Sequence, residues 1–139
     1  KTVIQLGDRD MRKMLNLLEA TLMSCKKNNY ITINDVYTTA GLPSLEEFNK
    51  LLTLINQKNK KTGVIYNKVN KERLSKGYAV QDLINMIHDK IKSNQCSLND
   101  EQMRKCYIKL ADMDYIFRKG GDEEVVLQNF ICLIREYNL

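Results

Sequence analysis

Apolar residues recur along this chain at intervals of three and four positions, which is the spacing of one face of an α-helix. The first such stripe consists of Met11, Met14, Leu15, Leu18 and Leu22. Asp8 or Asp10 can cap the start of this helix, and the polar residues 26–29 end it. The pattern therefore predicts a first amphipathic helix between about residue 10 and residue 26.

A second and shorter helix is predicted directly after the first. Thr32 and Asp35 have the spacing of a capping box, and Gly41 is typical of the residue that ends a helix. Leu42 and Pro43 then interrupt the helical pattern. We therefore expect a domain boundary here, which divides the chain into residues 1–43 and residues 44–139.

Five more helices are predicted after Pro43, at about residues 44–55, 62–75, 79–92, 97–119 and from residue 122 onward. Gly77 and the pair Gly120–Gly121 separate three of them. The residues expected to face the core are Leu45, Phe48, Leu51, Leu52, Ile55, Ile65, Tyr66, Val69, Val80, Leu83, Ile84, Ile87, Ile91, Met103, Cys106, Leu110, Met113, Phe117, Val126, Phe130, Leu133, Ile134 and Tyr137.

The fold class that follows is all-α, with about two helices before Pro43 and about five after it. The only strand-like stretch is the short segment at residues 30–33. Short connections between the last five helices favour an antiparallel bundle or an orthogonal array. The last helix carries more apolar residues than one face can use, at Val125, Leu127 and Ile131, and this surplus predicts a second buried surface against neighbouring subunits.

Charge adds one feature to this picture. The net charge is +5, and much of the excess lies between residues 56 and 77, where seven basic residues accompany Glu72 alone. These residues are Lys58, Lys60, Lys61, Lys68, Lys71, Arg73 and Lys76. A solvated helix face explains them best, because Tyr66 is the only aromatic residue among them. The alternative is a free-standing basic helical module that binds nucleic acid through this Lys58–Lys76 region.

Candidate catalytic and metal-binding residues are few. Cys25, Cys96, Cys106 and Cys132 are scattered without a close pair, and His88 is the single histidine, so we expect no metal site. An enzyme that uses Cys106 or His88 is the least favoured hypothesis, because His88 lies among isoleucines. No apolar run approaches the length of about 20 residues that crosses a bilayer, so no membrane partner is expected.

Acidic pairs do not indicate catalysis either. Glu46–Glu47 and Glu123–Glu124 lie at predicted helix starts, where the helix dipole favours negative charge. Asp112 and Asp114 lie in the long helix and could form hydrogen bonds across a bundle interface. The sequence also contains no Gly-x-x-x-x-Gly-Lys-Ser/Thr loop for phosphates, so this polypeptide is not expected to be an enzyme by itself.

Four segments resemble the clamp-loader ATPase family, in the small subunits of replication factor C. They are Asp-Met-Arg-Lys-Met-Leu-Asn at residues 10–16, Val-Tyr-Thr-Thr-Ala-Gly-Leu-Pro at 36–43, Lys-Gly-Tyr-Ala-Val-Gln-Asp-Leu at 76–83 and Lys-Leu-Ala-Asp-Met-Asp-Tyr at 109–115, followed by Gly120–Gly121. They occur in the order of the family and span nearly the whole chain. The resemblance implies that residues 1–43 are the C-terminal part of an ATPase lid domain and that residues 44–139 are a five-helix collar domain.

The resemblance also implies a function and partners. In this family, the arginine at the position of Arg12 contacts the γ-phosphate of ATP, and guanidinium suits such a contact. ATP and Mg would belong to the full-length protein and no cofactor to this part. The implied partners are the other subunits of a five-membered ring, joined through the collar. The intact complex would load a sliding clamp onto primer–template DNA in the nucleus. Two departures from the family stand beside this motif, Gly7 in place of serine and Arg9 in place of glycine.

Overall fold

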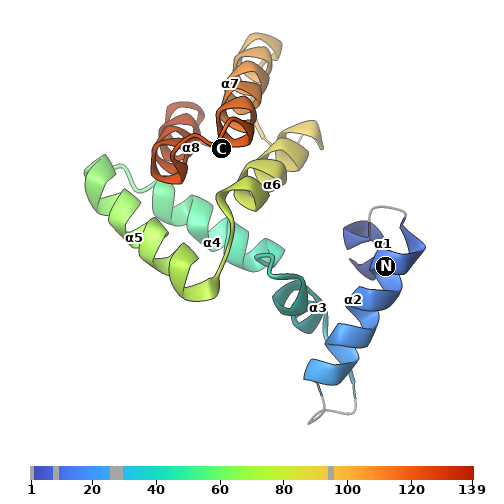
Figure 1. Cartoon of the computed structure of the whole chain (residues 1–139). Coiled ribbons are helices and arrows are strands. Elements are labelled where there is room, and N and C mark those ends of the chain that lie inside the picture. Colours follow the sequence, from blue (N-terminus) through green and yellow to red (C-terminus); the bar gives the residue numbers. More distant parts are fainter. Residues whose placement is uncertain (1, 8–9, 26–29, 94–95) are drawn as a thin grey trace. The chain divides into compact units, whose positions relative to one another are not determined.

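The computed structural model describes residues 2–7, 10–25, 30–93 and 96–139, and within these ranges every regular element is an α-helix (Figure 1). The helices are α1 (Thr2–Leu6), α2 (Met11–Ser24), α3 (Ile33–Ala40), α4 (Leu45–Ile55), α5 (Thr62–Lys76), α6 (Val80–Lys92), α7 (Asp100–Arg118) and α8 (Glu123–Tyr137). The prediction of an all-α fold with five helices after Pro43 is confirmed. Before Pro43 the structure has a further short helix, α1, whose five residues carry too little periodicity to be predicted.

Two compact units make up the chain, Lys1–Glu46 and Glu47–Leu139. In the first unit α1, α2 and α3 pack on one another. The side chain of Asp10 accepts hydrogen bonds from the backbone N–H groups of Arg12 and Lys13 and so caps α2. Thr32 and Asp35 form the predicted capping box of α3.

The buried face of α2 differs from the apolar stripe of the sequence. Thr21 is fully buried and Met14 and Leu17 are half-buried, whereas Leu15 and Leu22 are more than half exposed. Met11 and Leu18 are exposed as well. The small unit therefore leaves most of the apolar face of α2 uncovered within the described residues.

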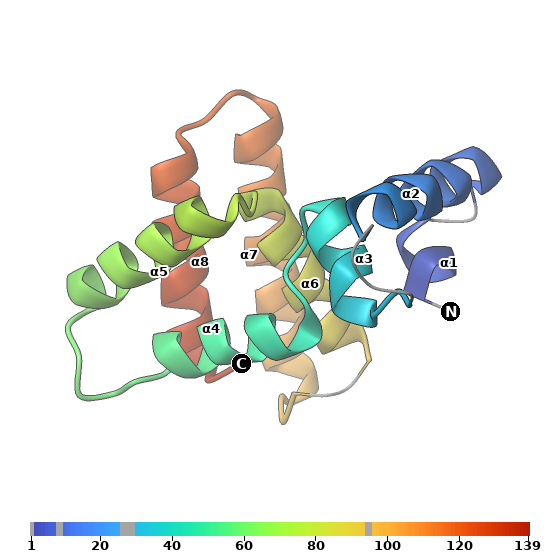
Figure 2. The ribbon, with the colours of Figure 1, turned by 90° about the horizontal axis from the view of Figure 1, so that it is seen from below.

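The second unit contains the main hydrophobic core. In it α7 and α8 lie side by side, α6 packs against both of them, and α5 packs against α8 (Figures 1 and 2). The turn between α7 and α8 closes at Gly120, whose φ of 77° is a left-handed conformation that glycine adopts without strain. The most deeply buried side chains are Ile55, Ile65, Val69, Val80, Leu83, Ile87, Ile91, Cys106, Val126, Leu127, Phe130, Ile131, Leu133 and Ile134.

The surplus of apolar residues in α8 is mostly absorbed by this core. Leu127 and Ile131 are fully buried within the unit, so the prediction that they form a second, intersubunit surface is wrong for these two residues. The reason is that α8 packs against three helices, α5, α6 and α7, so its buried face is wider than the stripe that a single neighbour would cover. Val125 is the member of the predicted set that stays exposed, at 47% of its surface.

Candidate assembly surface and nucleotide-contact residue

Arg12 lies in the first turn of α2, one residue after the start of the helix. The carboxylate of Asp10 accepts the backbone N–H of Arg12 at 2.9 Å and that of Lys13 at 3.2 Å, so it holds the main chain of this turn. The side chain of Arg12 is exposed, and it forms no ion pair with any described residue. A guanidinium that is fixed at its base and open at its tip can bind an anion such as a phosphate. Its role in ATP contact stays a prediction, and Arg9 lies outside the described residues.

The outer side of α7 and α8 combines exposed apolar side chains with a groove. We call this region the α7–α8 surface and define it by Ile108, Asp112, Tyr115, Ile116, Val125, Asn129 and Cys132. Ile108 is 62% exposed and Tyr115 is 63% exposed. The groove has a volume of about 260 Å³, and the buried residues Met113 and Leu133 form part of its lining. Large exposed apolar side chains beside a groove are typical of an interaction surface.

A polar bridge closes one end of the groove. The Nζ of Lys109 in α7 lies 2.6 Å from the carboxylate of Glu136 in α8, and 5.4 Å from the centre of the Tyr137 ring. The hydrogen bond between Lys109 and Glu136 raises the pKa of Lys109 and lowers the pKa of Glu136. Both groups therefore stay charged near neutral pH and hold the two helices in register at the rim.

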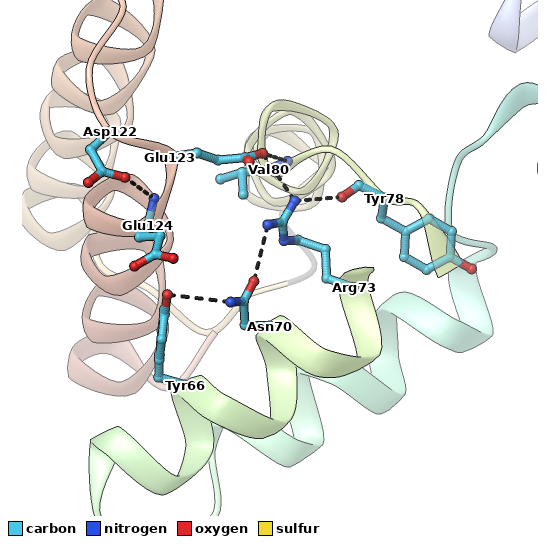
Figure 3. Close-up of polar contacts among 8 residues, drawn as sticks. All are labelled: Tyr66, Asn70, Arg73, Tyr78, Val80, Asp122, Glu123 and Glu124. Atoms are coloured by element: carbon cyan, nitrogen blue, oxygen red, sulfur yellow. Dashed lines mark hydrogen bonds and ion pairs between the residues drawn. The ribbon is translucent and has the colours of Figure 1, made fainter. Parts of the chain in front are cut away.

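Arg73 belongs to the basic run of the sequence at residues 56–77 but not to a basic surface. Its side chain is 8% exposed, and Nη1 donates to the backbone oxygen of Tyr78 and to Glu123, each at 3.0 Å (Figure 3). Nη2 donates to Asn70 at 3.1 Å. Lys76 is also engaged, because its Nζ lies 2.7 Å from Glu47. The structure therefore separates these two cations from the exposed lysines of the run.

The same polar contacts explain the acidic pairs at the helix starts. Glu123 begins α8, which suits the helix dipole, but it also pairs with Arg73. Glu47 accepts the hydroxyl of Tyr78 at 2.9 Å, in addition to the ammonium of Lys76. Burial, followed by the hydrogen bond to Glu47, raises the pKa of Tyr78 to about 12. Neither acid is arranged as a catalytic pair.

Cys106 and His88, the candidate catalytic residues, lie in different surroundings. Cys106 is fully buried, and burial raises the pKa of its thiol, which disfavours the reactive thiolate. His88 stacks edge-on against Tyr107, with ring centres 5.4 Å apart. Asp114 accepts a hydrogen bond from Gln81 of α6 at 2.9 Å, which confirms the expected contact across helices, and it pairs with Arg118. Asp112 lines the groove of the α7–α8 surface instead.

Within the described ranges, no three or more His, Cys, Asp or Glu side chains are grouped so that they could hold a metal ion. In the same part of the chain, no helix has the length and apolar character needed to span a bilayer.

Comparison with known proteins shows the family to which the chain belongs. Residues 43–132 match the model of the replication factor C C-terminal domain, a range that covers α4 to α7 and most of α8. The chain is 31% identical to replication factor C subunit 3 of Saccharomyces cerevisiae over 127 residues, which cover 90% of this chain and 36% of that protein. It is 26% identical to replication factor C subunit 5 of Homo sapiens over 132 residues, which cover 95% of this chain and 37% of that protein.

A third relative is the probable replication factor C subunit 5 of Caenorhabditis elegans, which is 29% identical over 91% of this chain and 33% of its own length. The chain thus spans about a third of the length of these relatives. The family resemblance carried by the four sequence motifs is confirmed by these matches. The chain belongs to the replication factor C family, through its C-terminal domain.

Proposed function

We propose that this chain is the assembly part of a clamp-loader subunit, in which the second unit joins sister subunits of replication factor C into a ring. The family match over the helices of this unit is the observation that carries the proposal. The relatives that share it are named as numbered subunits of one factor, which supports a hetero-oligomer. In the intact complex the chain would contribute to loading a sliding clamp onto primer–template DNA, and its location would be nuclear.

The α7–α8 surface is the part of the second unit that we assign to the contact with a sister subunit. Ile108, Tyr115 and Ile116 would form its apolar centre, and the groove would accept an apolar side chain of the partner. The Lys109–Glu136 bridge would lie at its polar rim. This arrangement of an apolar centre and a polar rim supports a protein contact rather than a solvated face.

Arg12 would act in a different part of the same subunit. We propose that its guanidinium contacts a phosphate of ATP, with Mg bound to the same nucleotide by residues outside this chain. Its exposed position beside the Asp10 cap supports this role. ATP hydrolysis by these residues alone is not expected, because the sequence holds no phosphate-binding loop. Replacement of Arg12 by alanine in the full-length subunit should weaken ATP-dependent clamp loading and leave assembly intact.

The assembly proposal is tested with two substitutions of equally exposed residues. Ile108 of α7 and Leu74 of α5 are both 62% exposed, so glutamate at either position stays solvated in the free chain. Ile108→Glu should weaken association with sister subunits by on the order of a hundredfold, because a buried unpaired charge costs several kcal/mol. Leu74→Glu should leave association unchanged. Analytical ultracentrifugation of co-expressed subunits measures both, and equal association by the two variants would refute the assigned surface.

A further inference from the structure

A group of basic residues in and around α5 is not used by the proposed assembly contact. We define the cationic track as Lys58, Lys61, Lys68, Lys71 and Arg135. Lys61 is the residue that precedes α5, and Lys68 and Lys71 follow it after seven and ten positions, which places the three on one side of the helix. They span ten residues of helix, or about 15 Å.

The track continues past the start of α5 onto α8. The Nη1 of Arg135 in α8 donates to the hydroxyl of Thr62, the first residue of α5, at 3.0 Å. Arg135 and Lys58 also line one polar cavity of about 390 Å³. The single carboxylate in that lining, Glu136, pairs with Lys109 at 2.6 Å. Among the described residues, the two cations that line this cavity therefore have no acidic partner of their own.

None of the five cations takes part in an ion pair within the described part of the chain. Other basic residues of the second unit do have acidic partners, as Lys105 has Glu101 and Arg118 has Asp114. The one acidic residue of α5, Glu72, lies 3.9 Å from Lys76. The positive charge of the track is thus not compensated by an ion pair with any described residue.

Local helix physics does not account for these lysines. A cation at Lys61 is opposed by the helix dipole, and α5 has neither a side-chain cap nor an acidic residue in its first turn. Lys68 and Lys71 are three residues apart, so their like charges repel. An external anion would remove both penalties.

A nucleic-acid backbone fits this surface better than an acidic protein does. The exposed apolar residues of α5, Val64 and Leu74, are ten positions and about 15 Å apart, so they cannot form the continuous apolar centre of a protein interface. Tyr66 and Arg73, which could stack on bases or read them, are turned toward the core (Figure 3). The four lysines of the track suit contacts with phosphates, and its one arginine, Arg135, already donates a hydrogen bond to Thr62.

We propose that the cationic track binds the phosphate backbone of duplex DNA without sequence preference. The 15 Å of α5 corresponds to the rise of about four base pairs along the axis of duplex DNA. This inference goes beyond the assembly role and does not depend on it, because the track and the α7–α8 surface use different residues.

Fluorescence anisotropy with two short DNA duplexes of unrelated sequence tests the proposal on the full chain. Both duplexes should bind equally well, with a dissociation constant of about 10⁻⁴–10⁻⁶ M at physiological salt. The triple variant Lys61→Gln/Lys68→Gln/Lys71→Gln should bind at least about tenfold more weakly, and the slope of log K against log salt should become shallower by about 2–3. The variant Lys61→Arg/Lys68→Arg/Lys71→Arg keeps the charge and should bind as the original chain does.

The matched control is Lys50→Gln/Lys92→Gln/Lys119→Gln, which removes three exposed lysines outside the track and lowers the net charge by the same amount. It should retain most of the binding. Equal loss in the two glutamine variants would mean that net charge alone attracts DNA, and no loss in either would exclude the track. Failure of the original chain to bind the duplexes, or equally strong competition by polyglutamate, would also overturn the proposal. Assembly with sister subunits should be unaffected in the triple glutamine and triple arginine variants of the track.

Discussion

The guanidinium of Arg73 and the carboxylate of Glu123 lie 3.0 Å apart, although fifty residues separate them along the chain. Arg73 is in the last turn of α5 and Glu123 is the first residue of α8, so each charge is also favoured by the dipole of its own helix. The second bond of Nη1, to the backbone oxygen of Tyr78, ties the pair to the segment that enters α6. One buried cation thus fixes the ends of three helices of the second unit (Figure 3).

Removal of this cation should destabilise the second unit more than removal of an exposed one. Arg73→Met keeps much of the aliphatic bulk but leaves the oxygen of Tyr78 and the carboxylate of Glu123 without their donor. We expect a loss of about 2 kcal/mol in the free energy of unfolding, reduced from the fully buried case because Glu123 is 43% exposed. Arg118→Met is the matched control, because Arg118 pairs with Asp114 while 78% exposed, and it should cost about 0.5 kcal/mol or less. Urea denaturation of the two variants measures the difference, and equal losses would contradict it.

The sequence pattern predicts the helices well because the signals for them are local. The Thr32–Asp35 capping box and the glycine at position 77 each act within one turn, and both occur as expected. Burial depends instead on which helices become neighbours. For this reason the sequence pattern predicts an outer surface at Ile131, although neighbouring helices bury it. For the same reason the pattern groups Arg73 with the exposed basic residues, although it is buried.

The candidate site could be predicted only in part for the same reason. The position of Arg12 in the first turn of α2 follows from the sequence, because Asp10 is a strong cap. The α7–α8 groove and the Arg135–Thr62 contact cannot be predicted from local sequence, because each brings together residues that are far apart in the chain. A possible signal for the groove was the exposed apolar pair Ile108 and Tyr115, which lie seven residues apart and outside the predicted core stripe of α7.

Stability should fall in strongly alkaline solution in a way that depends on Tyr78. Its hydroxyl donates to Glu47, and its pKa is about 12 in the folded chain, compared with an ordinary value of 10.0. Because the folded state holds this proton more tightly than the unfolded state, the stabilisation is complete below pH 10 and is lost as the pH rises toward 12. Denaturation curves measured between pH 10 and pH 12 should therefore show a decline in the free energy of unfolding, and this decline should be smaller in Tyr78→Phe.

Two comparisons isolate this effect. Tyr115→Phe removes a tyrosine that is 63% exposed, and it should leave the alkaline decline as it is in the original chain. At neutral pH Tyr78→Phe should cost about 1 kcal/mol, because one hydrogen bond to a charged acceptor is lost while Lys76 keeps its contact with Glu47. If Tyr78→Phe shows the same alkaline decline as the original chain, Tyr78 does not contribute to it.

Thiol labelling should distinguish the α7–α8 surface from the core. Cys132 is exposed and lines the groove, whereas Cys106 is fully buried with a pKa that burial raises. A maleimide reagent should therefore modify Cys132 rapidly and Cys106 only when the chain opens. Mass spectrometry of peptides from a time course identifies the order, and rapid labelling of Cys106 would contradict the buried position.

The same reaction reports on assembly. Addition of sister subunits should slow the labelling of Cys132 if the α7–α8 surface is covered, by tenfold or more for a stable interface in which the groove is filled. Cys132→Ser removes the signal and identifies the peptide. Labelling of Cys132 that stays equally fast in an assembled complex would place the contact on another face.

Met14 packs so closely against Gly7 that no side chain fits at position 7 without a shift. A Cβ atom built on Gly7 would lie 2.1 Å from the Cγ of Met14 and 3.0 Å from the backbone oxygen of Val3. This contact accounts for the glycine at a position where the family resemblance leads us to expect serine. Gly63 differs, because a Cβ built there would meet no atom within 4 Å.

Gly7→Ala should consequently destabilise the first unit, by about 1–3 kcal/mol, because overpacking forces Met14 out of its position or shifts the turn between α1 and α2. Gly63→Ala is the matched control, and it should be neutral or stabilise α5 by up to about 1 kcal/mol, since alanine favours a helix over glycine. Hydrogen exchange measured separately for the two units distinguishes the two effects on stability, because the two substitutions lie in different units.

A double variant tests whether Met14 is the residue that restricts position 7. In Gly7→Ala/Met14→Ala the loss in the free energy of unfolding should be smaller than the sum of the single losses, because the shortened side chain at position 14 leaves room for the new methyl group. Additive losses, or unchanged exchange in Gly7→Ala, would show that Met14 does not restrict position 7.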